Sequence, residues 1–229
     1  MEQIYKYRSF SASIASGYKL FRSNIRTILA KSWIEALAMG ITFGLLLVGC
    51  YKASALGICL AAVAFVVALV FWIERLFVLI DGGTLKDKLW RAAVTTVVGV
   101  LFLALPLIGV PLINVMMEIM LEEHPKPLKA LATGFKHWGY LFLMLLMSGM
   151  IMAILIAVIC IPLNISIYGL IVDHIGTVAG DPSGLPSTFP IILFFVGTLT
   201  MFVMVFVQIW QTYAIAYSHG AILTRDNRK

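Results

Sequence analysis

The chain has 229 residues, of which 61% are apolar and only 12% are charged. An average soluble domain is about half apolar and a quarter charged, so this composition, with a mean hydropathy of +0.99, argues against a soluble globular protein, a disordered chain and a secreted disulfide scaffold. Several charge-free stretches approach or exceed the ~20 apolar residues that a membrane span needs: 36–51, 53–73, 92–117, 137–172 and 182–224. We therefore predict an all-α polytopic membrane protein, a single integral membrane domain over 1–229.

The N-terminal 1–32 segment predicts an amphipathic helix that lies in the cytosolic membrane interface. Its apolar residues recur every three to four positions and its basic residues fall on another face: Phe10, Ile14, Tyr18, Phe21, Ile25 and Ile28 against Lys19, Arg22 and Arg26. This pattern places basic side chains among lipid headgroups; a helix packed on a partner subunit is the alternative. A helical hairpin follows over 33–73, and Leu85–Trp90 predicts a second short interfacial helix.

The segment 92–117 is interrupted by the run from Pro106 to Pro111. Proline inside a helix removes a hydrogen bond and kinks or breaks the helix. The segment therefore either crosses the membrane once with a kink or forms a Pro-broken hairpin that returns to the side it came from. A single crossing spreads the lysines and arginines over both sides, whereas the hairpin leaves only Lys52 outside. The positive-inside rule favours the hairpin.

The last helical pair occupies 139–222, with spans at 139–162 and 189–213. The loop 173–190 between them holds two aspartates and three prolines but no lysine or arginine, so we predict that it is extracytoplasmic. The layout is then four full spans plus the hairpin, about six hydrophobic helices, in a multi-pass protein of the cytoplasmic (inner) membrane with both termini cytosolic. Its basic cytosolic face favours anionic lipid headgroups as partners and argues against nucleic acid.

Two stretches of the sequence are alike. Ala15–Lys19 and Ala132–Lys136 share the pattern A-[ST]-G-[YF]-K, and each shortly precedes a long apolar span. They predict a threefold repeat of an amphipathic helix followed by a hydrophobic pair, with chance similarity as the alternative; binding sites of membrane proteins can lie at repeat interfaces. Small residues four positions apart, at Gly40 and Gly44 and at Gly149 and Ala153, predict close approach of helices.

The N-terminal stretch carries a family resemblance. Ser9–Phe21, with its repeated serines, followed by Asn24–Ile28, resembles uncharacterised bacterial integral membrane families that are similar to the membrane domain fused to some glycerophosphodiester phosphodiesterases. The likeness is one of layout over the whole chain plus this stretch. It implies a bacterial cytoplasmic membrane protein with six hydrophobic helices. It carries over no catalytic residue, because the phosphodiesterase domain of such fusions is absent from these residues.

Polar residues within membrane segments are candidates for function because they are costly to bury. Asn114, Glu118 and Glu122 follow the proline run at four-residue steps, which places them on one helix face. They predict a cation or headgroup site at the mouth of the hairpin, with a solvated helix end as the alternative. Glu122, Glu123 and His124 lack a second histidine at helical spacing, so we assign no metal there.

Two further polar groups are weaker candidates. Glu74 and Arg75 end the second span; as neighbours they point to different faces and are expected to pair with other helices. In the last span Gln208, Gln211 and Thr212 suggest hydrogen bonds between helices, or a polar track for a substrate.

No motif for catalysis accompanies these residues. The sequence lacks the phosphate-binding G-x-x-x-x-G-K-[ST] loop, the G-x-S-x-G elbow and the H-E-x-x-H pair, so we assign no catalytic, cofactor-binding or metal-binding residue and consider an enzyme unfavoured. The favoured function is a non-enzymatic integral membrane protein that supports membrane organisation or a partner complex, with a protein partner or homo-oligomer as an open option. The alternatives are a small transporter or channel-like protein for a small solute or lipid and an interfacial lipid-modifying enzyme.

Overall fold

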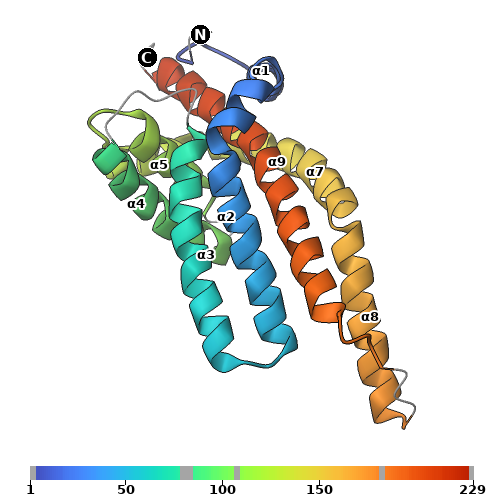
Figure 1. The fold of residues 1–229 in the computed structure, drawn as a ribbon. Coiled ribbons are helices and arrows are strands. Elements are labelled where there is room, and N and C mark those ends of the chain that lie inside the picture. Colours follow the sequence, from blue (N-terminus) through green and yellow to red (C-terminus); the bar gives the residue numbers. More distant parts are fainter. Residues whose placement is uncertain (1–3, 78–84, 106–108, 181–183, 227–229) are drawn as a thin grey trace. The chain divides into compact units, whose positions relative to one another are not determined.

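The computed structural model describes residues 4–77, 85–105, 109–180 and 184–226. The described residues form helices and no strand. In chain order the helices are α1 (Phe10–Ser23), α2 (Ile25–Tyr51), α3 (Ala55–Leu76), α4 (Leu85–Ala104), α5 (Val110–Leu121), α6 (Pro127–Lys136), α7 (Trp138–Ile159), α8 (Ile161–Val178) and α9 (Phe189–Asp226) (Figure 1). The chain is thus the all-α polytopic membrane protein that the composition predicts.

Five of the described helices, namely α2, α3, α7, α8 and α9, are long and apolar enough to cross a membrane. The sequence predicts four full spans, and α8 is the span-like helix that it does not predict. The amide of Cys160 bonds the carbonyl of Ile156, and the amide of Asn164 bonds the carbonyl of Cys160. The helical hydrogen bonds therefore run through the junction, so α8 continues α7 and does not turn back. The predicted loop 173–190 is helical as far as Val178.

The predicted helix over 1–32 is divided in the structure. α1 ends at Ser23 and α2 begins at Ile25, so the residues up to 32 belong to the first long helix. Asn24 separates the two: its side-chain amide donates to the carbonyl of Leu20 at 3.0 Å and its backbone N–H bonds the carbonyl of Phe21. Asparagine is one of the residues that ends helices by satisfying their last carbonyls. A periodicity that continues past residue 24 does not reveal this break.

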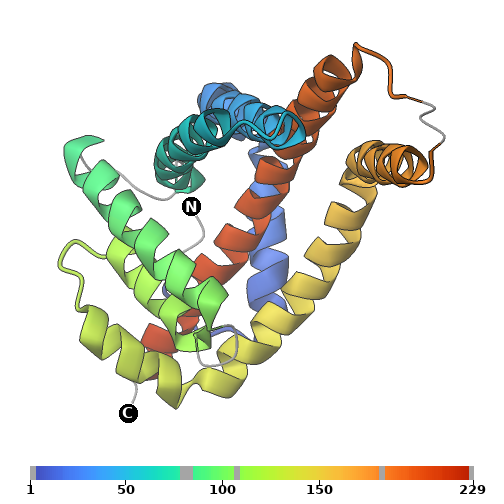
Figure 2. The same cartoon turned by 90° about the horizontal axis from the view of Figure 1, so that it is seen from below.

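The segment 92–117 is a hairpin. α4 and α5 run antiparallel side by side (Figure 2), and Arg91 near the start of α4 donates to the carbonyls of Glu122 and Glu123, at the end of α5, over 2.8 and 3.0 Å. The two ends of the hairpin therefore lie together, as the distribution of basic residues predicts. Pro106, where the break is predicted, lies outside the described residues. Leu85–Trp90 forms the first turns of α4 and is not a separate helix.

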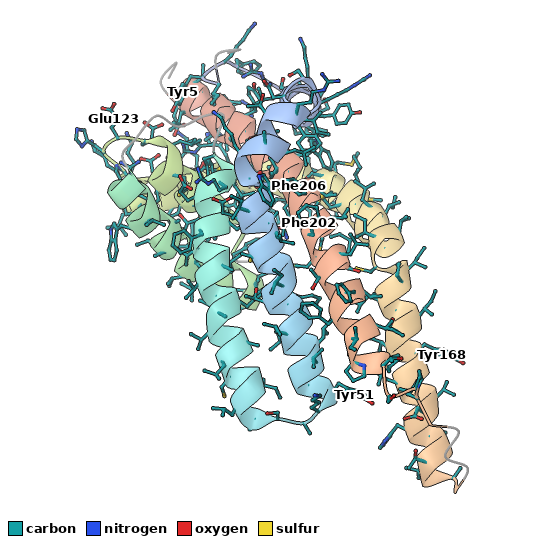
Figure 3. All side chains as sticks on the ribbon, in the orientation of Figure 1. Tyr5, Tyr51, Glu123, Tyr168, Phe202 and Phe206 are labelled. Carbon is teal, nitrogen blue, oxygen red and sulfur yellow. The ribbon has the colours of Figure 1, made fainter. Side chains whose placement is uncertain are left out.

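The chain divides into two compact units. Unit 1 comprises Met1–Trp33, Val70–Met152 and Val207–Lys229, and unit 2 comprises Ile34–Leu69 and Ala153–Phe206. In unit 2 the small residues of α2 meet α9: a β-carbon at Gly40 would lie 2.6 Å from the carbonyl oxygen of Thr198, and one at Gly44 2.7 Å from that of Phe194. The close approach predicted for these two glycines is confirmed. Much of α8 is exposed, as at Tyr168 (Figure 3).

In unit 1 the two sequence-related stretches make related contacts. A β-carbon at Gly17 of α1 would lie 2.5 Å from the backbone nitrogen of Ala214 in α9, and one at Gly134 of α6 2.9 Å from the α-carbon of Pro111 in α5. Each glycine therefore lies where a short helix packs directly on the backbone of a neighbouring helix, α1 on α9 and α6 on α5. A β-carbon at Gly149 of α7, by contrast, would meet no atom of the described residues within 4 Å, so no helix of the described chain approaches α7 closely at this position.

Candidate functional site

The face of α5 that carries the predicted polar residues lies in the interior of unit 1. Pro111 lies in the first turn of α5, where the lack of an amide proton costs nothing, and the helix then carries Asn114 and Glu118 inward. Asn114 is 1% and Glu118 8% exposed, while the side chain of Glu122, just past the helix end, is 31% exposed. A solvated helix end, the alternative considered for these residues, does not describe Asn114 or Glu118.

His219 of α9 completes this group. It is 1% exposed and its Nδ1 lies 2.8 Å from Oδ1 of Asn114. Its Nε2 lies 3.7 Å from Oε2 of Glu118 and 3.8 Å from Oε1 of Glu122, which is beyond hydrogen-bonding distance. We refer to Asn114, Glu118, Glu122 and His219 as the buried polar cluster.

The hydrogen bonds of Asn114 fix the orientation of the histidine ring. The amide nitrogen of Asn114 donates to the carbonyl of Ala130 in α6 at 2.8 Å, so its oxygen faces His219 and accepts from Nδ1. Nδ1 therefore carries a proton, and Nε2 is the nitrogen that can either carry a second proton or bind a ligand. Nε2 is directed at the two carboxylates and has no hydrogen-bond partner among the described residues.

The carboxylates of Glu118 and Glu122 also accept hydrogen bonds from residues outside the cluster. Glu118 Oε1 accepts from the backbone amide of Lys126 at 3.1 Å, and Glu122 Oε1 accepts from the hydroxyl of Tyr5 at 2.8 Å. The imidazole of His219, and then the Tyr5 hydroxyl, hold the pKa of Glu122 below its ordinary value against the opposing effect of burial. Burial, and next the bond to Glu122, raises the pKa of Tyr5. Glu122 is therefore ionised near neutral pH, and Tyr5 is a neutral donor.

Charged residues around the cluster fasten the N-terminal segment and α6 to the end of α9. Asp226 accepts from Lys136 Nζ at 2.6 Å and lies 3.2 Å from Nε2 of His137. The guanidinium of Arg225 donates to the carbonyl of Arg8 at 3.0 Å and lies over the ring of Tyr140 at 4.4 Å. Several basic residues of the predicted cytosolic face therefore make contacts within the protein as well.

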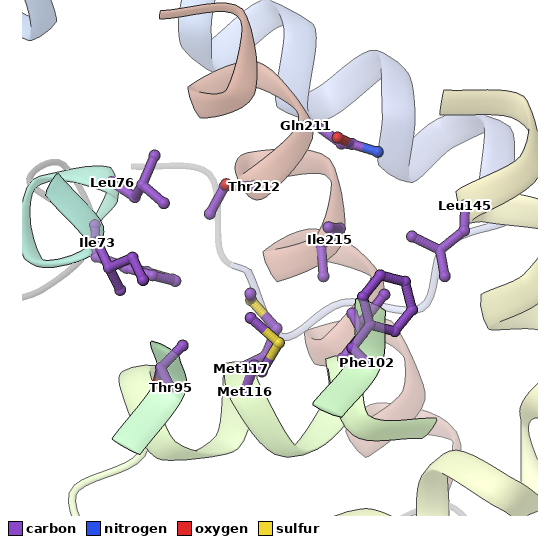
Figure 4. A pocket seen from close by; sticks show the side chains of 12 residues that line it. Ile73, Leu76, Thr95, Phe102, Met116, Met117, Leu145, Gln211, Thr212 and Ile215 are labelled. Carbon is purple, nitrogen blue, oxygen red and sulfur yellow. The ribbon is translucent and has the colours of Figure 1, made fainter. Parts of the chain in front are cut away.

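A cavity of about 310 Å³ lies in unit 1 among α3, α4, α5, α7 and α9 (Figure 4). Its wall is almost entirely apolar: Ile73, Leu76, Phe77, Phe102, Ile113, Met116, Met117, Leu145 and Ile215, with Thr95, Gln211 and Thr212 as the polar members. Thr95 is 2% exposed, and its hydroxyl has no hydrogen-bond partner among the described residues.

The remaining candidates from the sequence are distributed as follows. Gln211 lines the cavity and its amide nitrogen lies 3.5 Å from the hydroxyl of Ser148 in α7, a bond between helices as expected. Gln208 is not among the lining residues. Arg75 and Glu74 pair with each other at 3.3 Å, so the expectation that neighbours would not pair is wrong; the long guanidinium side chain bends back at the end of α3.

Sequence reasoning missed three residues of this region: His219 as the partner of the acidic face, Tyr5, and Thr95. His219 has a detectable signal, because a histidine in a long apolar helix is costly and is a candidate for function. Tyr5 and Thr95 have none, since a tyrosine before the first helix and a threonine in an apolar run are ordinary.

No family model, curated protein or solved structure matches this chain.

Proposed function

We propose that the chain is a non-enzymatic integral membrane protein that supports membrane organisation by holding an acyl chain of a glycerolipid in the cavity of unit 1. The observation that carries this proposal is the cavity wall, which is apolar except for a few side chains. Ligand sites are mostly apolar, with a small number of polar groups that fix orientation.

The surroundings of α4 favour a lipid as the occupant. One face of α4 lines the cavity through Thr95 and Phe102, while Val97, Val100 and Leu103 on its other faces are 61%, 60% and 76% exposed. In a membrane protein, apolar side chains that are exposed in this way contact lipid chains. The lipid chains that contact the exposed face of α4 are therefore apolar, as is the wall of the cavity on its other face.

The same proposal includes a location. We place the protein in a bacterial cytoplasmic membrane with both termini cytosolic, as the family resemblance and the positive-inside rule favour. Because α8 continues α7 in the same helical hydrogen-bond pattern, we count the two helices as one crossing. The number of crossings then stays even, which leaves both termini on the same side. The exposed basic residues of the cytosolic side then attract anionic headgroups. Support of a partner complex remains compatible with this location.

Retention of lipid by the purified protein tests the proposal. Replacing Met116 with tryptophan, at a half-buried position of the cavity wall, should fill the cavity and lower the amount of lipid that native mass spectrometry detects on the protein. Leu103→Trp is the matched control, because it adds an indole to the exposed face of α4, where Leu103 is 76% exposed.

We expect lipid adducts on the wild-type chain and on Leu103→Trp and their loss from Met116→Trp. Equal retention by all three variants, or no retained lipid on a folded wild-type chain, contradicts the proposal.

A transporter is the second candidate, favoured by one observation. Gln211 and Thr212, which the sequence suggests as a polar track, do line the cavity. A transporter predicts that Gln211→Ala abolishes flux of a small solute into vesicles while expression stays normal. The lipid-holding function predicts no such flux in the wild-type protein.

A further inference from the structure

Three ligand-type atoms of the buried polar cluster converge. Nε2 of His219 and one carboxylate oxygen each of Glu118 and Glu122 all lie within 4.8 Å of one another. The histidine separations of 3.7 and 3.8 Å are too long for hydrogen bonds, and Nε2 has no hydrogen-bond partner among the described residues. Two carboxylates close to each other repel one another unless a positive charge lies between them.

The free nitrogen of the histidine is already prepared for a ligand. Nδ1 donates to Asn114, whose amide nitrogen donates to the carbonyl of Ala130, so Nε2 is the ring nitrogen left to bind a ligand. Histidines that bind metals almost always donate their other ring nitrogen to a fixed acceptor in this way. His219 is 1% exposed with Nε2 unpartnered in the described part of the chain, and this observation is independent of the acidic side chains.

We propose that Glu118, Glu122 and His219 form a binding site for a divalent transition-metal ion, with Asn114 as the residue that positions the histidine. One imidazole and two carboxylates are a ligand set that Zn²⁺ and its neighbours accept. The two carboxylate charges balance the charge of the ion, which offsets the cost of burying them.

The three ligand atoms lie somewhat wider than such an ion requires. Ligand atoms at 2.0–2.1 Å from Zn²⁺ in a tetrahedral site lie about 3.3 Å apart. From 3.7 and 3.8 Å the carboxylates have to approach His219 by about half an ångström, and from within 4.8 Å they have to approach each other by up to about 1.5 Å. Three protein ligands leave the fourth position of a tetrahedral ion open. The Tyr5 hydroxyl, which donates to Glu122 at 2.8 Å, stands beside that carboxylate and orients it.

A protonated His219 that forms ion pairs with both carboxylates is the competing account of the same geometry. It needs no metal, and it predicts a protein that ignores added ions. Binding of Zn²⁺ to the full-length chain in detergent separates the two accounts. The protein is treated with a chelator, incubated with Zn²⁺ and dialysed, and its metal content is measured by plasma mass spectrometry.

We expect one Zn²⁺ per wild-type chain, and a loss of affinity of about 100-fold or more in His219→Gln and Glu118→Gln, since even the residues that only orient metal ligands are worth 10–100-fold. His124→Gln and Glu123→Gln are the matched controls, because both residues are exposed neighbours in sequence and should leave binding unchanged. Co²⁺ provides a second readout, as its visible absorption reports four-coordinate binding by nitrogen and oxygen.

Since a substitution at a buried position can unfold the protein, each variant is also checked by circular dichroism and gel filtration, and Glu122→Gln, at the more exposed ligand, provides a milder variant. Binding that is substoichiometric in the wild type, or equal in wild type and folded ligand variants, overturns the metal site. Neither result affects the lipid proposal, which depends on the cavity and on retained lipid.

Discussion

Replacing Gly17 by alanine is expected to lower the free energy of unfolding by about 1–3 kcal/mol, the usual cost of forcing extra carbon into a well-packed interior. The added β-carbon would lie 2.5 Å from the backbone nitrogen and 2.7 Å from the α-carbon of Ala214. Because these are backbone atoms of α9, they cannot rotate away as a side chain can. α1 would have to lift from α9. The loss should appear as a lower midpoint of thermal unfolding in detergent.

The control for this prediction is Gly149→Ala. A β-carbon at Gly149 has no atom within 4 Å, and alanine favours a helix over glycine by about 1 kcal/mol. We therefore expect no loss of stability there. Gly134→Ala, at the sequence-related position of α6, should be destabilising like Gly17→Ala, because it meets the backbone of Pro111. Equal midpoints for Gly17→Ala and Gly149→Ala would show that α1 does not pack on α9 as described.

The second large effect is expected at Asn114. Asn114→Ala removes the acceptor of His219 Nδ1 and the donor to the carbonyl of Ala130, and it leaves the buried Nδ1–H of His219 without its acceptor. An unsatisfied buried group costs about 1–3 kcal/mol, so the free energy of unfolding should fall by about 1–3 kcal/mol. Chemical denaturation followed by circular dichroism measures this change.

Asn164→Ala is its matched control. Asn164 is exposed on α8, and exposed substitutions of this kind stay within about 0.5 kcal/mol. A loss at Asn114 no greater than at Asn164 would mean that the hydrogen bonds of the cluster contribute little to the stability of unit 1.

Much of the fold follows from sequence patterns because those patterns are local. The proline run at 106–111 predicts a break in the segment 92–117, and the distribution of basic residues then favours the hairpin of α4 and α5. Gly40 and Gly44 predict a close contact with another helix. The same spacing at Gly149 predicts a contact that the described residues do not make. A stripe of small residues permits close packing, but only the partner helix decides whether packing occurs.

The site could be predicted only in part, for the same reason. The four-residue steps place Asn114, Glu118 and Glu122 on one face of a helix. This prediction needs only the local spacing of residues along α5. His219 lies 105 residues further along the chain from Asn114, and nothing local indicates which helix faces which. The end of α1 at Asn24 and the continuation of α7 into α8 depend on backbone hydrogen bonds, which a hydrophobic pattern does not reveal.

The proposed topology places the buried polar cluster on the cytosolic side of the membrane. Cysteine accessibility tests this most directly, with single cysteines introduced into a background that lacks Cys50, Cys59 and Cys160, which are free thiols. Glu123→Cys, at the exposed end of α5, reports on the side of the cluster. Ser187→Cys, exposed between α8 and α9, reports on the opposite side.

With a membrane-impermeant thiol reagent added to intact cells, we expect labelling of Ser187→Cys and no labelling of Glu123→Cys until the membrane is permeabilised. Labelling of Glu123→Cys in intact cells would place the cluster on the outer side and contradict the proposed topology.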